Sequence, residues 1–225
     1  QGQVEQFIQR DYDWETRQSF ISSDLGFSSD NWKTFAELGW LGISLSEESG
    51  GFGGTSIDTM IVMEEFGKGL VLEPFLETVV MCAGLIDTAG SPEQKKDILT
   101  GVVEGKTQLS LAYAEPQSRF NLSDVMTEAK KEGDNFILNG FKSVVMNGPN
   151  SHQIIVSART SGDQRDESGV SLFIVDANSS GLSLRDYQTV DNRRASEVTL
   201  ESVTVPASSL IGELDQGLSI LESSI

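Results

Sequence analysis

The spacing of apolar residues changes once along this chain, close to Leu109. Before that point they recur every three to four residues, as in amphipathic helices, and after it they alternate in twos, as in half-buried strands. A single all-helical or all-strand domain cannot satisfy both patterns. We therefore predict an all-α domain followed by an antiparallel β-barrel or sandwich. We expect a ligand site at their junction, Leu109–Gly148, because ligands favour such boundaries.

Residues 1–107 are predicted to form the helical domain, because helix-start signals recur through them. Ser28–Asp30 and Thr55 or Ser56 are candidate N-caps, and the run Ser91–Gln94 combines a cap with proline in the first turn. Between the first two of these helices, Leu41–Leu45 is predicted to be a short extended piece.

The glycine-rich run Ser49–Gly54 could be mistaken for a phosphate-binding loop. No Gly-Lys-Ser/Thr follows it, and no GxGxxG pattern opens the next helix, so we interpret it as a turn that leads to a helix cap. In the helix that follows, Met60 and Met63 are expected to fill the core. Glu64 and Glu65 are expected to be solvated or ion-paired.

A further helix is predicted from Pro74 to Thr88, since proline suits a first helical turn. Its apolar face carries the single cysteine, Cys82, which can form no intrachain disulfide and is expected to be a core residue. The only histidine, His152, lies in a polar turn and is expected at the surface. With one residue of each type, we expect no metal site built on soft ligands.

Residues 108–214 are predicted to form the β domain, and Pro206 closes its last strand. The expected strands are Leu109–Tyr113, Phe136–Gly140, Ile154–Ala158, Val170–Val175 and Val198–Val205. From Gly217 a helical pattern begins. Residues 215–225 are therefore expected to be the start of a third, helical domain, whose remainder is not among these 225 residues.

The net charge of −18, from 34 acidic and 16 basic side chains, excludes several partners. Nucleic acid and anionic membranes are bound by clusters of Lys and Arg, and none is present. No apolar run approaches the roughly 20 residues of a membrane span, and no signal peptide is visible. We therefore expect a cytoplasmic protein without nucleic-acid or membrane partners.

Several short motifs in a fixed order resemble the acyl-CoA dehydrogenase family over essentially the whole chain. They are Glu37–Gly42, Glu47–Gly54, Ala114–Pro116, Leu138–Lys142, Asn147–Gly148, Arg194–Ser196 and Val203–Pro206. Four other runs are similar to a subgroup, the small subunits of pimeloyl-CoA dehydrogenases. These runs are Val71–Val80, Gln117–Phe120, Phe141–Val145 and Val156–Gly162.

The resemblance implies a flavoprotein that uses FAD to oxidise an acyl-CoA thioester to the trans-2-enoyl-CoA. In this chemistry a carboxylate removes the α-proton, and the flavin accepts the β-hydrogen as hydride. The subgroup implies a dicarboxylyl-CoA such as pimeloyl-CoA. Family members carry the base in a C-terminal helical domain, so no catalytic residue is assigned in this chain. The resemblance also implies a homo- or hetero-oligomer, a dimer or tetramer that can include a large subunit, and an acceptor such as an electron-transfer flavoprotein.

Position by position, the resemblance also assigns binding residues. The cofactor-binding positions are Leu111, Tyr113, Ala114, Phe120, Val144 and Met146, and the substrate-binding positions are Arg119 and Phe120. Glu115 matches a glutamate that belongs to the family's loop motif and does not act as the base.

The chain departs from the family pattern at these same positions. Gln117–Asn121 stand where the family has Gly-Ala-Gly-Ser-Asp, Ala114 replaces a threonine, and Val144–Met146 replace Trp-Ile-Thr. Two hydroxyl donors are lost, and at about 0.5–1.5 kcal/mol each this weakens flavin binding roughly tenfold or more. Arg119 adds a guanidinium that can bind a phosphate or a distal carboxylate.

Two hypotheses therefore remain open. The chain is an FAD-dependent dehydrogenase subunit with a rearranged pocket, or it is a structural partner subunit that binds no flavin and assembles with a catalytic large subunit.

Overall fold

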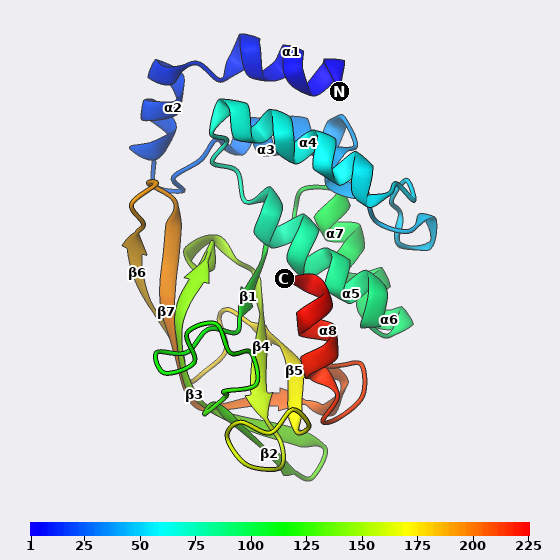
Figure 1. Cartoon of the computed structure of the whole chain (residues 1–225), viewed down its shortest axis with the longest axis vertical. Coiled ribbons are helices and arrows are strands. Elements are labelled where there is room, and N and C mark those ends of the chain that lie inside the picture. Colours follow the sequence, from blue (N-terminus) through cyan, green and yellow to red (C-terminus); the bar gives the residue numbers. More distant parts are fainter.

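The computed structural model describes all 225 residues and consists of a helical part and a β part, arranged end to end (Figure 1). The longer helices and the helical segments that continue them are α1 (Gly2–Asp11), α2 (Trp14–Ile21), α3 (Ser29–Glu37), α4 (Ser56–Gly69), η3 (Leu76–Ala83), α5 (Gly84–Ala89), α6 (Pro92–Gln94), η4 (Lys95–Leu99), α7 (Thr100–Val103) and α8 (Gly217–Ser224). All but α8 precede the first strand. The predicted fold class, a helical region followed by a mostly antiparallel β domain, is confirmed.

The predicted helix starts are present. Ser28 caps α3 by accepting a hydrogen bond from the Asn31 amide at 3.2 Å. Thr55 caps α4 in a capping box with Asp58. Ser91 forms a capping box with Gln94 at the start of α6. These signals are readable in the sequence because each cap bonds to a residue only three positions away.

The expected extended piece at Leu41–Leu45 is wrong: the chain there forms the 3₁₀ turn η1 (Trp40–Gly42), and a second one, η2 (Glu47–Ser49), follows. The glycine loop explains the difference, because its backbone folds back onto this segment. Amides of the loop donate to the carbonyls of Gly42 and Ile43 at 3.0 and 2.9 Å. These bonds hold the loop as a packed turn, in agreement with its predicted structural role.

The helix predicted from Pro74 forms, but its geometry was not expected. Its first part, η3, is π-helical and runs without a break into α5, and η4 is a second π-helical segment between α6 and α7. An apolar periodicity near 3.6 residues cannot distinguish π from α hydrogen bonding. Short π segments often occur at functional sites.

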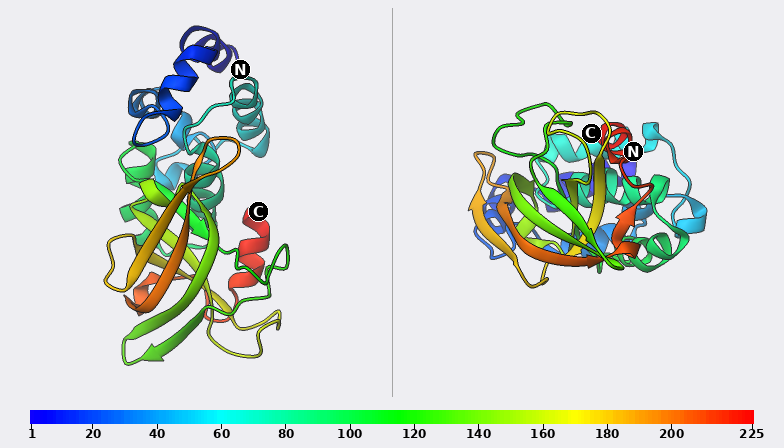
Figure 2. Two further views of the ribbon diagram at one scale, coloured as in Figure 1. Left: turned by 90° about the vertical axis from the view of Figure 1, so that its left-hand side faces the viewer. Right: turned by 90° about the horizontal axis from the view of Figure 1, so that it is seen from below.

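The β part is one curved sheet with the strand order β6-β7-β3-β2-β4-β5-β8, and β1 pairs in parallel with β4 (Figure 2). The strands are β1 (Leu109–Ala112), β2 (Glu128–Glu132), β3 (Asn135–Met146), β4 (Gln153–Arg159), β5 (Val170–Asp176), β6 (Leu182–Gln188), β7 (Arg194–Pro206) and β8 (Leu210–Ile211). Strands β2 and β6 were not predicted. Their side chains are mostly exposed or half-buried, so they lack a clear apolar alternation.

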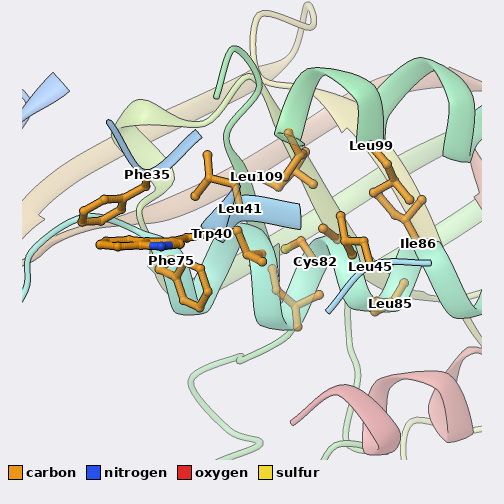
Figure 3. Packing of buried hydrophobic residues seen from close by; sticks show 14 of the residues in the cluster. Phe35, Trp40, Leu41, Leu45, Phe75, Cys82, Leu85, Ile86, Leu99 and Leu109 are labelled. Atoms are coloured by element: carbon orange, nitrogen blue, oxygen red, sulfur yellow. The ribbon is translucent and has the colours of Figure 1, made fainter. Parts of the chain in front are cut away.

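Two apolar cores support these parts. The larger one fills the helical part and reaches Leu109 of β1 (Figure 3). It continues through Leu111 of β1 and Leu172 of β5. The second lies within the sheet. Helix α8 packs against α5 and β5, so it also lies at the junction. The helical and β parts therefore share a continuous apolar contact.

Cys82 is fully buried in the larger core, as predicted. The prediction for Met60 is wrong, because its side chain is 57% exposed. Helix α4 instead turns Val62 and Phe66 inward, and Met63 is half-buried against the core.

Candidate functional site

A mostly apolar pocket of about 430 Å³ lies at the junction of the two parts, and we call it the junction pocket. The helical segment η3 forms one wall, and β1 with its following residues and the end of β3 form another. The lining residues are Leu76, Glu77, Val80, Met81, Leu111, Tyr113, Ala114, Val144, Met146, Arg193, Ser224 and Ile225. Five of the six positions predicted to bind the cofactor therefore line this pocket, and Phe120 is the one that does not.

A β-bulge in β3 shapes the pocket wall. Lys142 pairs with Val198 of β7, but Val145 pairs with Ser196, so β3 contains one residue more than its partner. Val144 lies within the bulge and is 46% exposed at the pocket, whereas Val145 is fully buried in the sheet core. The bulge therefore presents Val144 to the pocket without breaking the packing of the strand.

Two charged side chains, Glu77 and Arg193, also line the pocket. Arg193 Nη2 donates to Glu77 Oε1 at 2.5 Å, and the Glu77 side chain is only 5% exposed. Glu77 Oε2 is buried and has no hydrogen-bond partner. The sequence patterns predicted neither residue. A glutamate inside the long apolar run that follows Pro74 was a signal for Glu77, but no pattern paired it with an arginine 116 residues away.

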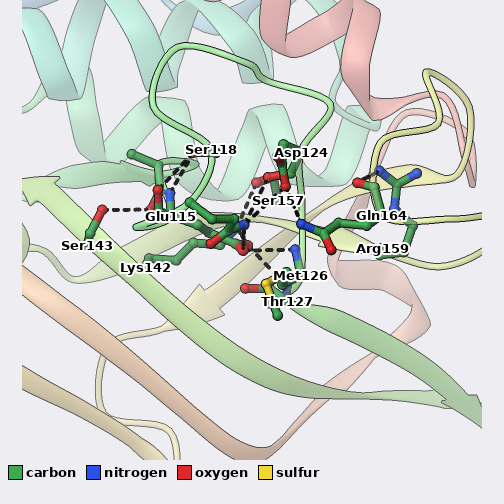
Figure 4. A network of polar contacts seen from close by, with 12 residues as sticks. Glu115, Ser118, Asp124, Met126, Thr127, Lys142, Ser143, Ser157, Arg159 and Gln164 are labelled. Atoms are coloured by element: carbon green, nitrogen blue, oxygen red, sulfur yellow. Dashed lines mark hydrogen bonds and ion pairs between the residues drawn. The ribbon is translucent and has the colours of Figure 1, made fainter.

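Glu115 is the centre of a buried polar network beside the pocket (Figure 4). Its Oε1 accepts from Lys142 Nζ at 2.7 Å, and the amides of Met126 and Thr127 donate to the carboxylate at 2.8 and 3.0 Å. Lys142 is fully buried and also donates to Ser157 Oγ at 3.0 Å. Burial lowers the pKa of Lys142 to about 8, against the opposing effect of the Glu115 charge.

The same contacts decide what Glu115 can do. Burial alone would raise the pKa of this carboxyl, but the Lys142 ammonium and the hydrogen bonds outweigh it, so the pKa lies below its usual value. A carboxylate with a lowered pKa and its oxygens engaged by donors is a poor proton acceptor. The geometry agrees with a structural role for Glu115 in the loop.

The two positions predicted to bind substrate lie outside the junction pocket. Arg119 is exposed, has a positive φ of 50°, and its side chain makes no hydrogen bond or ion pair. Phe120 is 99% exposed. Both lie on the turn that follows Pro116, so neither lines the pocket with the other predicted positions.

His152 is exposed, as predicted, and its Nδ1 accepts a hydrogen bond from the Gln108 amide at 3.0 Å. No group of three or more His, Cys, Asp or Glu side chains is placed to hold a metal ion. None of the helices has the length and apolar character that crossing a bilayer requires.

Comparison with known proteins gives matches along almost the whole chain. Residues 1–106 match the family described as "Acyl-CoA dehydrogenase, N-terminal domain", and residues 110–203 match "Acyl-CoA dehydrogenase, middle domain". The mitochondrial isobutyryl-CoA dehydrogenase of Dictyostelium discoideum is 32% identical over 203 residues, which cover 88% of this chain and 49% of that protein.

Two solved structures extend this similarity to three dimensions. The FAD complex of PigA is 26% identical with a TM-score of 0.89, covering 99% of this chain and 59% of PigA. The prolyl acyl carrier protein oxidase AnaB is 26% identical with a TM-score of 0.88, covering 99% of this chain and 60% of AnaB. The chain spans about half the length of the curated relatives it matches.

Proposed function

Because this chain belongs to the acyl-CoA dehydrogenase family, we propose that it is part of an FAD-dependent enzyme that oxidises an acyl-CoA thioester to the trans-2-enoyl-CoA. Members of this family are FAD-binding flavoproteins, and the structural relatives include an FAD complex. The observation that carries the proposal is the junction pocket, in which five positions assigned to the flavin from sequence lie together.

The residues of the pocket suit a flavin ring. Nine of the 12 lining residues are hydrophobic, and the pocket lies against the packed segment η3 and the buried strand β1. Leu111 of β1 and the residues that follow this strand, Tyr113 and Ala114, would contact the ring from one side, and Val144 and Met146 of β3 would contact it from the other. When bound, the flavin supplies the hydride acceptor. A ring seated against these apolar walls would displace water from them, which strengthens the electrostatic interactions at the covered surface.

Arg119 is the residue proposed to bind a phosphate of the CoA moiety. The chain carries a net charge of −18, so a polyanion requires a local cation. The Arg119 guanidinium has no intramolecular partner and is exposed, and it is therefore free to bind a phosphate in a bidentate manner. Phe120, next to it, offers an exposed ring for packing against the same ligand.

The acyl chain itself could be uncharged or carry a second carboxylate, as the subgroup resemblance implies. A dicarboxylyl chain such as pimeloyl needs a cation where its distal end lies. In the junction pocket that cation would be Arg193, but Arg193 already pairs with Glu77 at 2.5 Å. The geometry therefore supports an uncharged chain inside the pocket better than a dicarboxylyl one.

The second candidate function, a structural partner subunit without flavin, is supported by the side chains of the pocket. Ala114 and Met146 provide no hydroxyl donor where the family has threonines. Such a subunit would assemble with a catalytic large subunit. In either case we propose that the protein acts as an oligomer, and that the subunit that carries the flavin passes its electrons to an acceptor such as an electron-transfer flavoprotein.

A flavin titration separates the two functions. We expect the purified chain to bind FAD, seen as a perturbed visible flavin spectrum that remains after gel filtration. The Ala114→Thr variant restores one hydroxyl and should tighten binding roughly two- to tenfold. Ala207→Thr, on the exposed turn η6 (Ala207–Ser209), is the matched control and should change nothing. Absence of binding by wild type and Ala114→Thr, both alone and with a large subunit, would contradict the enzyme proposal.

A further inference from the structure

A second pocket, of about 580 Å³, lies between the helical and β parts, and we call it the seam pocket. Helix α3 and residues 104–108, which lead into β1, line it from the helical side. The short turn η5 (Gly148–Asn150) and His152 line it from the β side. It shares no lining residue with the junction pocket, so a ligand here would be separate from the flavin.

Gln108 lines the seam pocket with a side chain that is nine-tenths buried, and the orientation of its amide follows from a series of hydrogen bonds. The Leu25 carbonyl can only accept, so Asn150 directs Nδ2 to it at 3.1 Å, and the same nitrogen donates to Asn147 Oδ1 at 3.1 Å. Asn147 Nδ2 in turn donates to Gln108 Oε1 at 3.3 Å. Gln108 Nε2 is left without a partner but, unlike Glu77 Oε2, it is not sealed from solvent. Its free N–H groups are therefore open to a ligand in the seam pocket.

His152 offers a second donor to the same pocket. The backbone N–H of Gln108 can only donate, and it donates to His152 Nδ1 at 3.0 Å. A neutral imidazole whose Nδ1 accepts carries its proton on Nε2. No group of the chain bonds to this Nε2–H, which makes it the second free N–H group at the pocket.

The charges around the seam pocket favour an anion. Lys33 Nζ lies 3.9 Å from Glu37 Oε1, which is too long for a hydrogen bond. Lys106 Nζ pairs at 2.7 Å with Glu104, the one carboxylate among the lining residues. The lining therefore carries more positive than negative charge, although the whole chain carries −18.

We propose that the seam pocket binds a small organic anion through its oxyanion group, a phosphate or a carboxylate. Gln108 Nε2 and His152 Nε2 donate to its oxygens, and Lys33 supplies a positive charge. Phe27 and Trp32 line the same pocket and offer apolar surface to the rest of the ligand. An unpaired donor on a largely buried side chain costs free energy, which bonding to an oxyanion recovers. This site goes beyond the proposed function and does not depend on it.

The test uses His152 as its reporter, because the chain has a single histidine and its ring signals in an NMR spectrum are unambiguous. The ring nitrogens should show the Nε2–H tautomer of the neutral imidazole before any ligand is added. Inorganic phosphate, benzoate and the neutral benzamide are then titrated at fixed pH and ionic strength. We expect a saturable shift with at least one of the two anions and none with benzamide. The anion that binds more tightly identifies the oxyanion class.

Variants separate this site from general attraction of ions. Gln108→Glu keeps the acceptor for Asn147 but replaces the free N–H groups with a carboxylate oxygen, so anion affinity should fall at least tenfold. Gln188→Glu makes the same change at an exposed position of β6 and should leave the affinity unchanged. Lys33→Gln should weaken binding severalfold, whereas Lys131→Gln, at an exposed position of β2, should not.

A shift of equal size on addition of sodium chloride would show general ion association and would overturn the proposal. Wild-type affinity in a folded Gln108→Glu variant would also overturn it. If thermal melts show that Gln108→Glu does not fold, the comparison of Lys33→Gln with Lys131→Gln decides instead, and equal affinities in those two would reject the site. None of these outcomes depends on flavin binding, so the proposed function is tested separately.

Discussion

Glu115 and Lys142 form an ion pair in which both side chains are almost completely buried, at 2% and 0% exposure. Removing two charges from water is costly, and the Coulombic attraction repays it only when further hydrogen bonds complete the site. Here Ser157 and the amides of Met126 and Thr127 supply those bonds. The pair thereby fixes the loop that carries Arg119 to the strand that carries the β-bulge.

Glu115→Gln tests this pair through its pH dependence. At pH 7 the variant removes the counter-charge of the buried Lys142 side chain, and breaking a buried ion pair in this way should lower the free energy of unfolding by about 3–5 kcal/mol. The pKa of Glu115 is lower in the fold than its ordinary value of 4.5. Its stabilisation is therefore complete above that value and is lost as the pH falls through the folded-state pKa. In urea titrations the difference between wild type and variant should shrink in acid.

Glu128→Gln is the control for that experiment, because Glu128 belongs to an exposed pair with Lys130 on β2. It should have little effect at any pH, since solvent screens exposed pairs. A difference between wild type and Glu115→Gln that stays constant from neutral to acidic pH would contradict the assigned charge state of Glu115.

Among the elements, those encoded by local signals were predictable and those set by the neighbouring structure were not. The caps at Ser28, Thr55 and Ser91 depend on bonds that span three residues, so the sequence predicts them. The π-helical geometry of η3, the exposed strands β2 and β6 and the bulge in β3 depend on tertiary pairing. For the site, the family resemblance assigned six residues to the cofactor, and five of them line the junction pocket. The sequence could not show that the sixth, Phe120, lies on an exposed turn outside that pocket.

The glycine loop before α4 owes its shape to close backbone approach. A Cβ at Gly51 would lie 2.3 Å from the carbonyl oxygen of Leu45, and one at Gly54 would lie equally close to that of Ile43. Real Cβ atoms do not approach oxygen so closely, so the packing of the loop requires glycine at both positions.

Gly51→Ala should therefore destabilise the protein, since the loop backbone must move away from Leu45. Gly67 provides a matched control, because it lies inside α4 and a Cβ added there would have no atom within 4 Å. Gly67→Ala should stabilise the fold by roughly 0.5–1 kcal/mol, because alanine is the better helix former. Thermal melts of the two variants should thus shift in opposite directions. A Gly51→Ala variant as stable as wild type would show that the loop is not packed as described.

At the scale of the whole molecule, the helical and β parts are joined by the turn between β6 and β7 as well as by the shared core. Arg17 of α2 donates to the Asp191 carbonyl of this turn at 3.3 Å, and Arg193 reaches Glu77 in η3. Arg194 donates to the carbonyls of Ile21 and Ser23 at 3.3 and 3.0 Å. These contacts join residues more than 100 positions apart, so no periodicity or local motif could have predicted them.

Arg194→Met should loosen this connection while leaving the strands intact. The methionine keeps much of the packing of the arginine stem but cannot bond to the Ile21 and Ser23 carbonyls at the end of α2 and just after it. We expect faster amide hydrogen exchange in residues 21–28, with little change in β3 and β4, whose amides are protected by the sheet. Arg185→Met, on the neighbouring strand β6, is the matched control, because Arg185 is exposed and pairs only with Glu197 across to β7. Equal acceleration of exchange in residues 21–28 by both variants would indicate a weakened β6–β7 hairpin as the cause. The bonds from Arg194 to the Ile21 and Ser23 carbonyls would then not be what fixes the helical part to the sheet.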